Sequence, residues 1–236
     1  MEAIKEPMKK YLVISDLHGK EFKEIYNIKI DFFCNDFDKI ILLGDYFDTY
    51  DYEIMKSKIQ LKRFEEIFEI KARDSRVEVL LGNHETMYLW KTEEERARLN
   101  YVNKCVDFEK EIKESIERHI RNKEIDIAFE TKKYIFSHQG INNMFMIGAG
   151  CKSIDELNNK LWNREYEIFD IREGLRWWWN EGRMIKGYEQ IDWLVSDMWG
   201  EKKQIVGHYQ RNGVRIYDNL IAIENAEHGN VVMVME

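Results

Sequence analysis

The stretch IILLGDYFDTY, residues 40–50, joins an apolar run directly to a glycine and two aspartates. A short apolar run that ends at a glycine is typical of a buried strand followed by a turn. Because Asp and Gly are common turn residues, this segment by itself predicts only a polar turn at the end of a strand. The alternative is that a metal site begins at this turn, and the rest of the sequence decides between the two.

The composition allows a sizeable core and argues against some classes of partner. The chain has 236 residues, of which 44% are hydrophobic and 13% aromatic, enough for a chain that folds alone. Its 44 acidic and 36 basic residues leave a formal charge of -8. Such a charge argues against electrostatic binding to long nucleic acid or to an anionic membrane, and leaves small ligands open.

The cysteines and the N-terminal segment indicate which cellular compartment to expect for the protein. Cys34, Cys105 and Cys151 are far apart and form no CxxC pair, which favours neither a disulfide framework nor a structural zinc site. We therefore expect a reducing, cytoplasmic location. The segment MEAIKEPMKK has no apolar signal core, and no stretch of about 18 apolar residues follows, so the sequence predicts neither secretion nor a membrane span.

Six short apolar runs bounded by turn residues predict buried strands. Helix-like segments at about 20–30 and 52–73 separate the first three runs, which predicts βαβ units and a parallel sheet covered on both faces. The later runs lie closer together and indicate a more mixed or antiparallel second half. The runs are 11–15, 39–43, 77–81, 133–137, 204–207 and 231–235.

The sequence predicts one domain, residues 1–236, because no repeat, low-complexity tract or Pro/Gly-rich linker interrupts it. Two insertions are expected within this domain. A charged segment at about 93–123 has few apolar positions and predicts a solvated helical excursion that exposes His119. A second, irregular and aromatic insertion spans about 142–200.

Side chains able to bind a metal follow five of the predicted strands, at the point where each strand ends. In open α/β sheets this edge is where ligands collect. Carboxylate, amide and imidazole groups together suit divalent first-row metals, and a carboxylate at a strand tip could bridge two cations about 3.5–4 Å apart. The five segments are Asp16-Leu17-His18-Gly19, Gly44-Asp45-Tyr46-Phe47-Asp48, Gly82-Asn83-His84-Glu85, His138 and His208.

Five ordered motifs, DLHG, GDYFD, GNHE, SHQG and VGHY, resemble those of the calcineurin-like metallophosphoesterases. Within that superfamily they are most similar to the protein serine/threonine phosphatase branch (PPP-like) and its phage and bacterial relatives, whose motifs read GDxHG, GDxVDRG, GNHE, HGG and GHT. The resemblance runs from about residue 11 to the C-terminus. It implies an α/β fold, a four-layer αββα sandwich of two mixed β-sheets flanked by helices, with the metal site at the strand ends.

The resemblance also implies a ligand set for two divalent ions. Asp16 and His18 would bind the first metal, and Asp45 would bridge the two. Manganese is the expected metal, with Fe, Zn, Co and Ni as alternatives. Asn83 would contact the substrate in addition to a metal. The second metal would be bound by Asn83, His138 and His208.

His84 resembles the family's general acid, which protonates the leaving oxygen, and Asp48 would lie behind it to orient the ring. An imidazole with a pKa near neutrality suits this role, and a carboxylate partner raises that pKa and selects the tautomer. A hydroxide bridging the metals would then attack phosphorus in line. Glu85 is expected to have a structural role, supporting local hydrogen bonds or capping a following helix.

The sequence departs from the phosphatase motifs at two positions. Thr49 stands where an arginine follows the second aspartate of GDxVDRG, and Tyr209 replaces a threonine beside His208. A replacement phosphate contact is expected in LWNREYEIF, residues 161–169, which resembles the LWxRExF segment of bacterial and phage members. Arg164 matches its arginine, and a guanidinium suits bidentate phosphate contact; a surface salt bridge is the alternative.

The segment RWWWNEGR, residues 176–183, has two interpretations. Trp177, Trp178 and Trp179 beside two arginines could stack a nucleobase. We favour the second interpretation, in which the insertion packs its own tryptophans against the sheet.

Together these features predict a dinuclear metal-dependent phosphoric-ester hydrolase, a phosphomonoesterase of the protein-phosphatase type that acts on a phosphoprotein or another phosphomonoester. The alternative enzyme is a nucleotide hydrolase that acts on dinucleoside polyphosphates or on a terminal phosphate of nucleic acid. The third interpretation is a non-catalytic binding module that keeps the fold. The filled ligand and acid positions argue against this third interpretation.

Overall fold

The structure is a computed structural model, and it describes residues 8–32, 36–48, 57–90, 108–169, 195, 197–208, 214–223 and 231–236. Thr49, Tyr209 and the tryptophan segment 177–179 lie outside these residues, so the expectations for them stay predictions. Among the described residues, every helix is too short or too polar to cross a bilayer.

The first sheet has a parallel core, as predicted. The strands β1, β2 and β3 run parallel, and β9 pairs antiparallel with β1. Two helices, α1 (Phe22–Phe32) and α2 (Ser57–Arg73), connect the parallel strands, which confirms the expected βαβ units. Across the sheet the order is β3 (Val77–Val79), β2 (Lys39–Leu42), β1 (Lys10–Ile14) and β9 (Val231–Met235).

The second sheet is mixed, again as expected. The strands β5, β6 and β8 run parallel, while β4 and β7 pair antiparallel with their neighbours. The sequence analysis did not predict β4, β7 or β8. The order is β4 (Ala128–Glu130), β5 (Tyr134–Ser137), β6 (Lys203–Val206), β8 (Leu220–Ile223) and β7 (Val214–Ile216).

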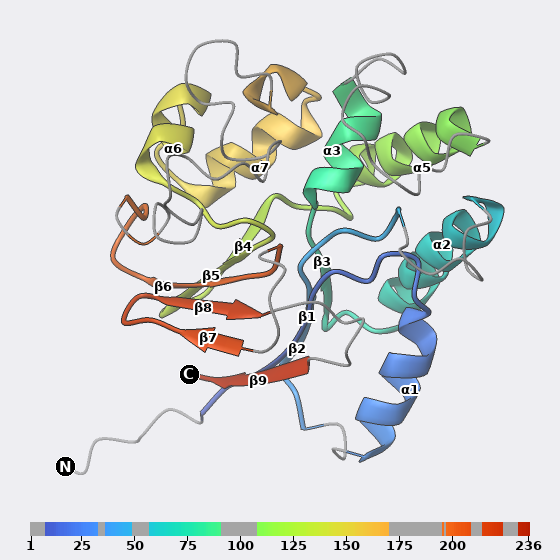
Figure 1. The fold of residues 1–236 in the computed structure, drawn as a ribbon, viewed down its shortest axis with the longest axis horizontal. Coiled ribbons are helices and arrows are strands. Elements are labelled where there is room, and N and C mark those ends of the chain that lie inside the picture. Colours follow the sequence, from blue (N-terminus) through green and yellow to red (C-terminus); the bar gives the residue numbers. More distant parts are fainter. Residues whose placement is uncertain are drawn as a thin grey trace.

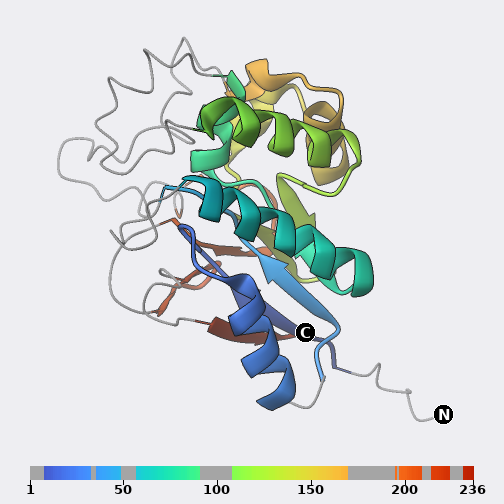
Figure 2. The ribbon, with the colours of Figure 1, turned by 90° about the vertical axis from the view of Figure 1, so that its right-hand side faces the viewer.

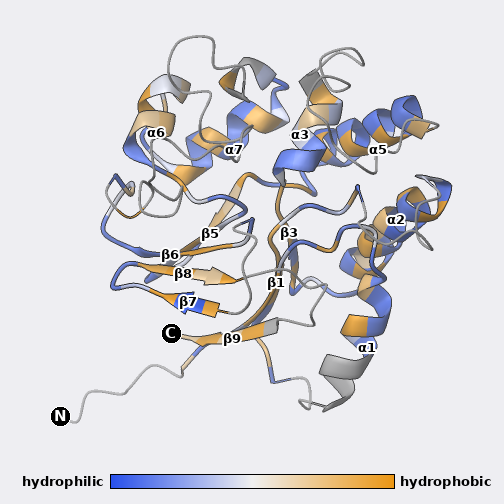
Figure 3. Ribbon diagram, viewed as in Figure 1, coloured by the Kyte–Doolittle hydropathy of each residue, from blue (hydrophilic) through white to orange (hydrophobic). Residues whose placement is uncertain are grey.

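Side chains alternate between two buried layers along the strands. On β1, Tyr11 and Val13 lie between the sheets, where Tyr11 packs 5.6 Å from the ring of Phe136. Leu12 and Ile14 point the other way, into the cluster shared with the helices. Because both faces are covered, the central strands are continuous apolar runs (Figure 3) rather than alternating ones.

Helices complete a four-layer αββα sandwich, which confirms the predicted fold. The helices α1 and α2 lie over the outer face of the first sheet (Figures 1 and 2). Two further helices, α6 (Asn143–Ala149) and α7 (Ile154–Trp162), lie over the second sheet, where Asn158 hydrogen-bonds the backbone of Ala128. These helices and the 3-10 helix η3 (Tyr166–Phe169) occupy the described part of the expected 142–200 insertion. The single-domain organisation stays a prediction.

The helix α5 (Glu109–Arg121) corrects the expectation of a solvated excursion for 108–123, the described part of the segment 93–123. Ile112, Ile116 and Ile120 recur at four-residue spacing and are fully buried, and α5 packs against α3 (Asn83–Trp90), α2 and α7. The apolar stripe is only one residue wide per turn, so the surrounding charges concealed it from the sequence analysis.

His119 is buried, which corrects the prediction that it is solvated. Only 6% of the residue is exposed, and its ring stacks on Phe68 with centroids 3.4 Å apart. Its Nδ1 lies 2.7 Å from a carboxylate oxygen of Glu124, and its Nε2 lies 3.2 Å from one of Glu65. His119 therefore joins α5 to α2, because buried polar atoms need partners.

Asp126 lies where the chain passes from the first sheet to the second. Its backbone pairs with Val79 and Leu81, and its Oδ1 is buried with no hydrogen-bond partner among the described residues. Burial raises the pKa of Asp126 to about 7, opposed by Lys71 and assisted by Glu78. The ionised carboxylate therefore destabilises the fold at neutral pH.

Asp126→Asn should stabilise the protein at pH 8 by about 1–3 kcal/mol, and by roughly a third of that amount at pH 5. Because the folded pKa is raised above the unfolded value, the stability that the protonated group contributes is present at low pH and is lost as the pH rises through about 7. Urea denaturation at both pH values measures the difference. An equal gain at pH 5 and pH 8 would contradict this explanation.

Candidate metal centre

The five predicted segments meet at one end of the two sheets. They follow β1, β2, β3, β5 and β6, whose parallel pairing brings their carboxyl ends to the same edge. Backbone hydrogen bonds join the segments: His18 N–H donates to the carbonyl of Asp45 at 2.7 Å, and Gly207 N–H donates to that of His138 at 2.9 Å. The tertiary structure thus assembles residues from position 16 to position 208.

The backbone is strained where the predicted site side chains leave the strands. Seven non-glycine residues among the described ones have a positive φ, and five of them are the predicted metal-binding and catalytic residues at strand ends. Such conformations cost of order 1 kcal/mol or more each and concentrate at functional sites. The five residues and their φ angles are Asp16 (52°), His18 (42°), Asp45 (56°), Asp48 (64°) and His208 (69°).

Two glycines allow the ligand loops to approach one another. A Cβ at Gly82 would overlap the backbone and side chain of Asp45, and one at Gly207 would overlap the hydroxyl of Ser15. Glycine is required at both positions because any side chain would push neighbouring loops apart.

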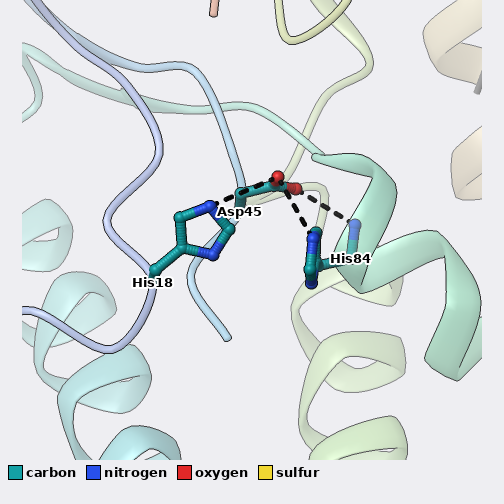
Figure 4. A group of neighbouring side chains, drawn as sticks. All are labelled: His18, Asp45 and His84. Carbon is teal, nitrogen blue, oxygen red and sulfur yellow. Dashed lines mark hydrogen bonds and ion pairs between the residues drawn. The ribbon is translucent and has the colours of Figure 1, made fainter. Parts of the chain in front are cut away.

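Asp45 lies between two groups of histidines. Its Oδ2 is 3.8 Å from Nε2 of both His18 and His84, and its Oδ1 accepts the backbone N–H of His84 at 3.0 Å (Figure 4). On its other side, Nε2 of His138 lies 3.1 Å from the same Oδ2. All four residues are at most 4% exposed, so the carboxylate faces both groups inside the protein.

A second group forms around the amide oxygen of Asn83. This Oδ1 lies 2.8 Å from Nε2 of His138 and 2.9 Å from Nδ1 of His208. Potential ligand atoms of Asp45, His138 and His208 lie within 4.8 Å of one another, as do those of His18, Asp45 and His84. Two groups of imidazole and carboxylate donors that share one aspartate fit two divalent cations.

Hydrogen bonds to backbone carbonyls orient two of these histidines. Nδ1 of His18 faces the carbonyl oxygen of Phe47 at 3.0 Å, and Nδ1 of His138 faces that of Leu43 at 2.9 Å. Because a carbonyl can only accept, each Nδ1 carries a proton, and Nε2 of each ring is the nitrogen that faces the centre.

Asp16 lies beside His18, as the predicted first-metal pair requires. Its Oδ1 is 3.9 Å from Nε2 of His18. Its Oδ2 accepts the Ser15 hydroxyl and the backbone N–H of His208, the latter at 3.1 Å. Asp16 therefore links the ends of β1 and β6.

Opposite charges shift the pKa values within the centre. Burial raises the pKa of Asp45, but His138 and His84 hold it well below the ordinary value of a carboxyl group. Burial lowers the pKa of His84, but Asp45 and Asp48 outweigh burial and raise it to about 10. Burial, with His138, lowers the pKa of His208 to about 3, which leaves a neutral ring.

Asp48 lies behind His84, in the predicted position. Its Oδ2 is 2.8 Å from Nδ1 of His84, and its Oδ1 accepts a 2.7 Å hydrogen bond from the hydroxyl of Tyr88. The sequence analysis missed Tyr88. The sequence feature that could have indicated Tyr88 is its four-residue spacing from His84, which places both side chains on one face of α3.

Glu85 joins two of the ligand loops, in line with its expected structural role. Its carboxylate accepts backbone N–H groups of Asp45 at 2.9 Å, Tyr46 at 2.8 Å and Gly82 at 3.0 Å. Burial and Asp45 raise the pKa of Glu85 to about 7, against the effect of the Tyr46 N–H. Glu85 thereby holds the end of β2 against the start of α3.

Arg164 follows α7 in a positive-φ conformation. Its side chain is half exposed, and a guanidinium nitrogen lies 3.5 Å from a carboxylate oxygen of Glu117 on α5. The surface ion pair that the sequence left as the alternative is thus present. The contact between Arg164 and substrate stays a prediction.

Comparison with known proteins identifies the family. The profile of the family described as calcineurin-like phosphoesterase matches residues 9–225. The chain belongs to this family. Family membership, together with the buried His and Asp groups, makes the protein a metal-dependent phosphoesterase, and its family uses a dinuclear metal site. A search of the curated proteins found no match.

Solved phosphatase structures share the fold of this calcineurin-like phosphoesterase. A mutant cold-active protein tyrosine phosphatase is 16% identical (TM-score 0.51; 92% of this chain and 71% of that one covered). A protein serine/threonine phosphatase from Saccharomyces cerevisiae is also 16% identical (TM-score 0.51; 96% and 72% covered). A candidate diadenosine tetraphosphatase is 12% identical (TM-score 0.50; 96% and 89% covered). At these identities the likeness establishes the fold and leaves the substrate open.

Proposed function

We propose that this phosphoesterase is a phosphomonoesterase of the protein serine/threonine phosphatase type. The observation that carries the proposal is the Asp48–His84 pair, in which Nδ1 of the imidazole lies 2.8 Å from the carboxylate and Nε2 faces Asp45. A protonated imidazole held in this way suits transfer of a proton to a leaving oxygen.

The proposed ligand roles are those that the resemblance to the family implies. Asp16 and His18 would hold one cation and Asp45 would be shared, with manganese as the expected metal. Bound cations would activate water near neutral pH and neutralise charge on the phosphate. The other cation would be held by Asn83, His138 and His208.

The remaining residues would position the proton donor and the substrate. His84 would donate the proton on Nε2 to the leaving oxygen, while Asp48 holds Nδ1 and Tyr88 holds Asp48. Asn83 and Arg164 are the proposed substrate contacts. We also infer a cytosolic enzyme, an inference that the buried free thiol of Cys151 supports.

Nucleotide hydrolysis is the second candidate. Thr49 stands where the protein-phosphatase motif has a phosphate-binding arginine, and the fold match to the candidate diadenosine tetraphosphatase covers most of both chains. A dinucleoside polyphosphate or a terminal phosphate of nucleic acid would then be the substrate.

The purified protein should hydrolyse para-nitrophenyl phosphate with added Mn²⁺, lose this activity with chelator and regain it when Mn²⁺ returns. Metal loss removes both the water activation and the charge neutralisation, so the rate should fall by at least about 1000-fold. A parallel screen of phosphopeptides, phosphomonoesters, phosphodiesters and dinucleoside polyphosphates separates the two candidates. Absence of hydrolysis with Mn, Fe, Zn, Co and Ni alike would contradict the proposed function.

A further inference from the structure

Gln139 occupies an unexpected position next to the metal centre. It follows His138 at the end of β5 and is only 2% exposed. The phosphatase motif that SHQG resembles reads HGG, with glycine at this position. The family pattern therefore assigns no role to the side chain that this protein buries here.

The amide of Gln139 contacts the distal side of His208. Its amide nitrogen, Nε2, lies 2.8 Å from Nε2 of the imidazole in this structure. The other ring nitrogen, Nδ1, lies 2.9 Å from Oδ1 of Asn83, which is itself 2.8 Å from Nε2 of His138. The ring of His208 is thus held between Gln139 and the second group of ligand atoms.

The direction of this hydrogen bond decides whether His208 can bind a metal. If the amide NH₂ donates, Nε2 is the acceptor and the proton of the neutral ring sits on Nδ1, where it blocks a cation. If the amide oxygen accepts, Nε2 carries the proton and Nδ1 keeps its lone pair. Rotation of the amide by 180° exchanges the two arrangements, since its O and N occupy equivalent places.

We propose that Gln139 is a positioning residue for the metal that His208 binds. With the amide rotated by 180° from its orientation in this structure, its oxygen accepts the Nε2–H of His208 and leaves the Nδ1 lone pair facing Asp45, Asn83 and His138. The inference rests on the proposed role of His208 as a ligand. The amide oxygen would fix the tautomer of His208, as the carbonyl oxygen of Leu43 does for His138.

The other ligand histidines are oriented by a similar hydrogen bond to an oxygen acceptor. The carbonyl of Phe47 accepts from His18, and that of Leu43 accepts from His138. His208 makes the corresponding contact with a side chain instead, that of Gln139 at the end of the neighbouring strand β5. Oxygen partners of this kind raise ligand basicity and fix the tautomer, and their loss commonly lowers metal affinity about 10–100-fold.

Titration of the chelator-treated full chain with Mn²⁺ in a calorimeter tests the proposal. Gln139→Leu, which has nearly the same size but no acceptor, should lower the affinity for one of two Mn²⁺ ions by about 10–100-fold. Gln139→Glu, which keeps an acceptor oxygen, should hold that affinity within about threefold of the parent protein. Circular dichroism and thermal melts establish that both variants are folded.

A role in packing alone predicts the opposite order, because leucine tolerates burial and a carboxylate does not. Parental affinity in Gln139→Leu, or an equal loss in both variants, would overturn the proposal. So would a parent protein that binds no Mn²⁺, because His208 would then be no ligand. A parent that binds two Mn²⁺ ions yet hydrolyses no phosphoester contradicts the proposed function and leaves the effect of Gln139 on affinity measurable.

Discussion

Replacing Asp45 with asparagine should abolish tight binding of both cations and lower kcat/KM by about 1000-fold or more, equivalent to about 4 kcal/mol. The carboxylate is the one acidic side chain shared by the two groups of potential ligands, with Oδ2 3.1 Å from His138 and 3.8 Å from His18. Asparagine has a similar shape but no charge, so the shared anionic ligand is lost. Mn²⁺ calorimetry and steady-state kinetics measure the two effects.

Asp218→Asn is the matched control, because this carboxylate is exposed in the turn between β7 and β8. It should bind Mn²⁺ and hydrolyse substrate as the parent protein does. Asp45→Asn protein that still binds two Mn²⁺ ions with parental affinity would rule out the bridging role.

His84→Asn should keep both metals and lose about 10²–10⁴ in kcat, with little change in KM. The proposed proton donor would be gone, while Asp45, Asn83 and the other ligands remain in place. The loss should be larger for an alkyl phosphate such as phosphoserine than for para-nitrophenyl phosphate, because a good leaving group needs less protonation. Measured kcat values for both substrates and Mn²⁺ titration complete the test.

The metal titration also distinguishes two roles for His84. Its Nε2 lies close enough to Asp45 and His18 for all three to serve one cation. If His84→Asn loses a metal ion together with its rate, the residue is a ligand and the proton donor lies elsewhere. An unchanged kcat for both substrates would exclude either role.

The positions of the candidate ligands were predictable because each follows an apolar run in the sequence. A parallel strand covered on both faces is a short, continuous apolar segment, and its last residue is easy to locate. Asp16, Asp45, Asn83, His138 and His208 all occur at such ends. The order of the motifs then indicated one site, and the structure does bring these side chains together, with Asp16 beside His18 and the backbone of His208.

Burial of charged segments was less predictable. His119 and the isoleucines of α5 lie in a run dominated by Lys, Glu and Arg, where average polarity indicates a solvated helix. Their burial depends on Phe68 and on the neighbouring helices, which are distant in sequence. Local composition does not indicate which distant residues will pack against a segment.

By itself, the sequence determined the class of fold, the edge of the sheets at which chemistry occurs and the residue types available there. These properties depend on local patterns: apolar runs, turn residues and the side chains that follow them. Only the tertiary structure decided which atoms meet. It placed Tyr88 on Asp48 and Gln139 on His208, and it set Asp45 between two histidine groups. Hydrogen bonds act over about 3 Å, and no pattern along the chain specifies which groups folding brings that close.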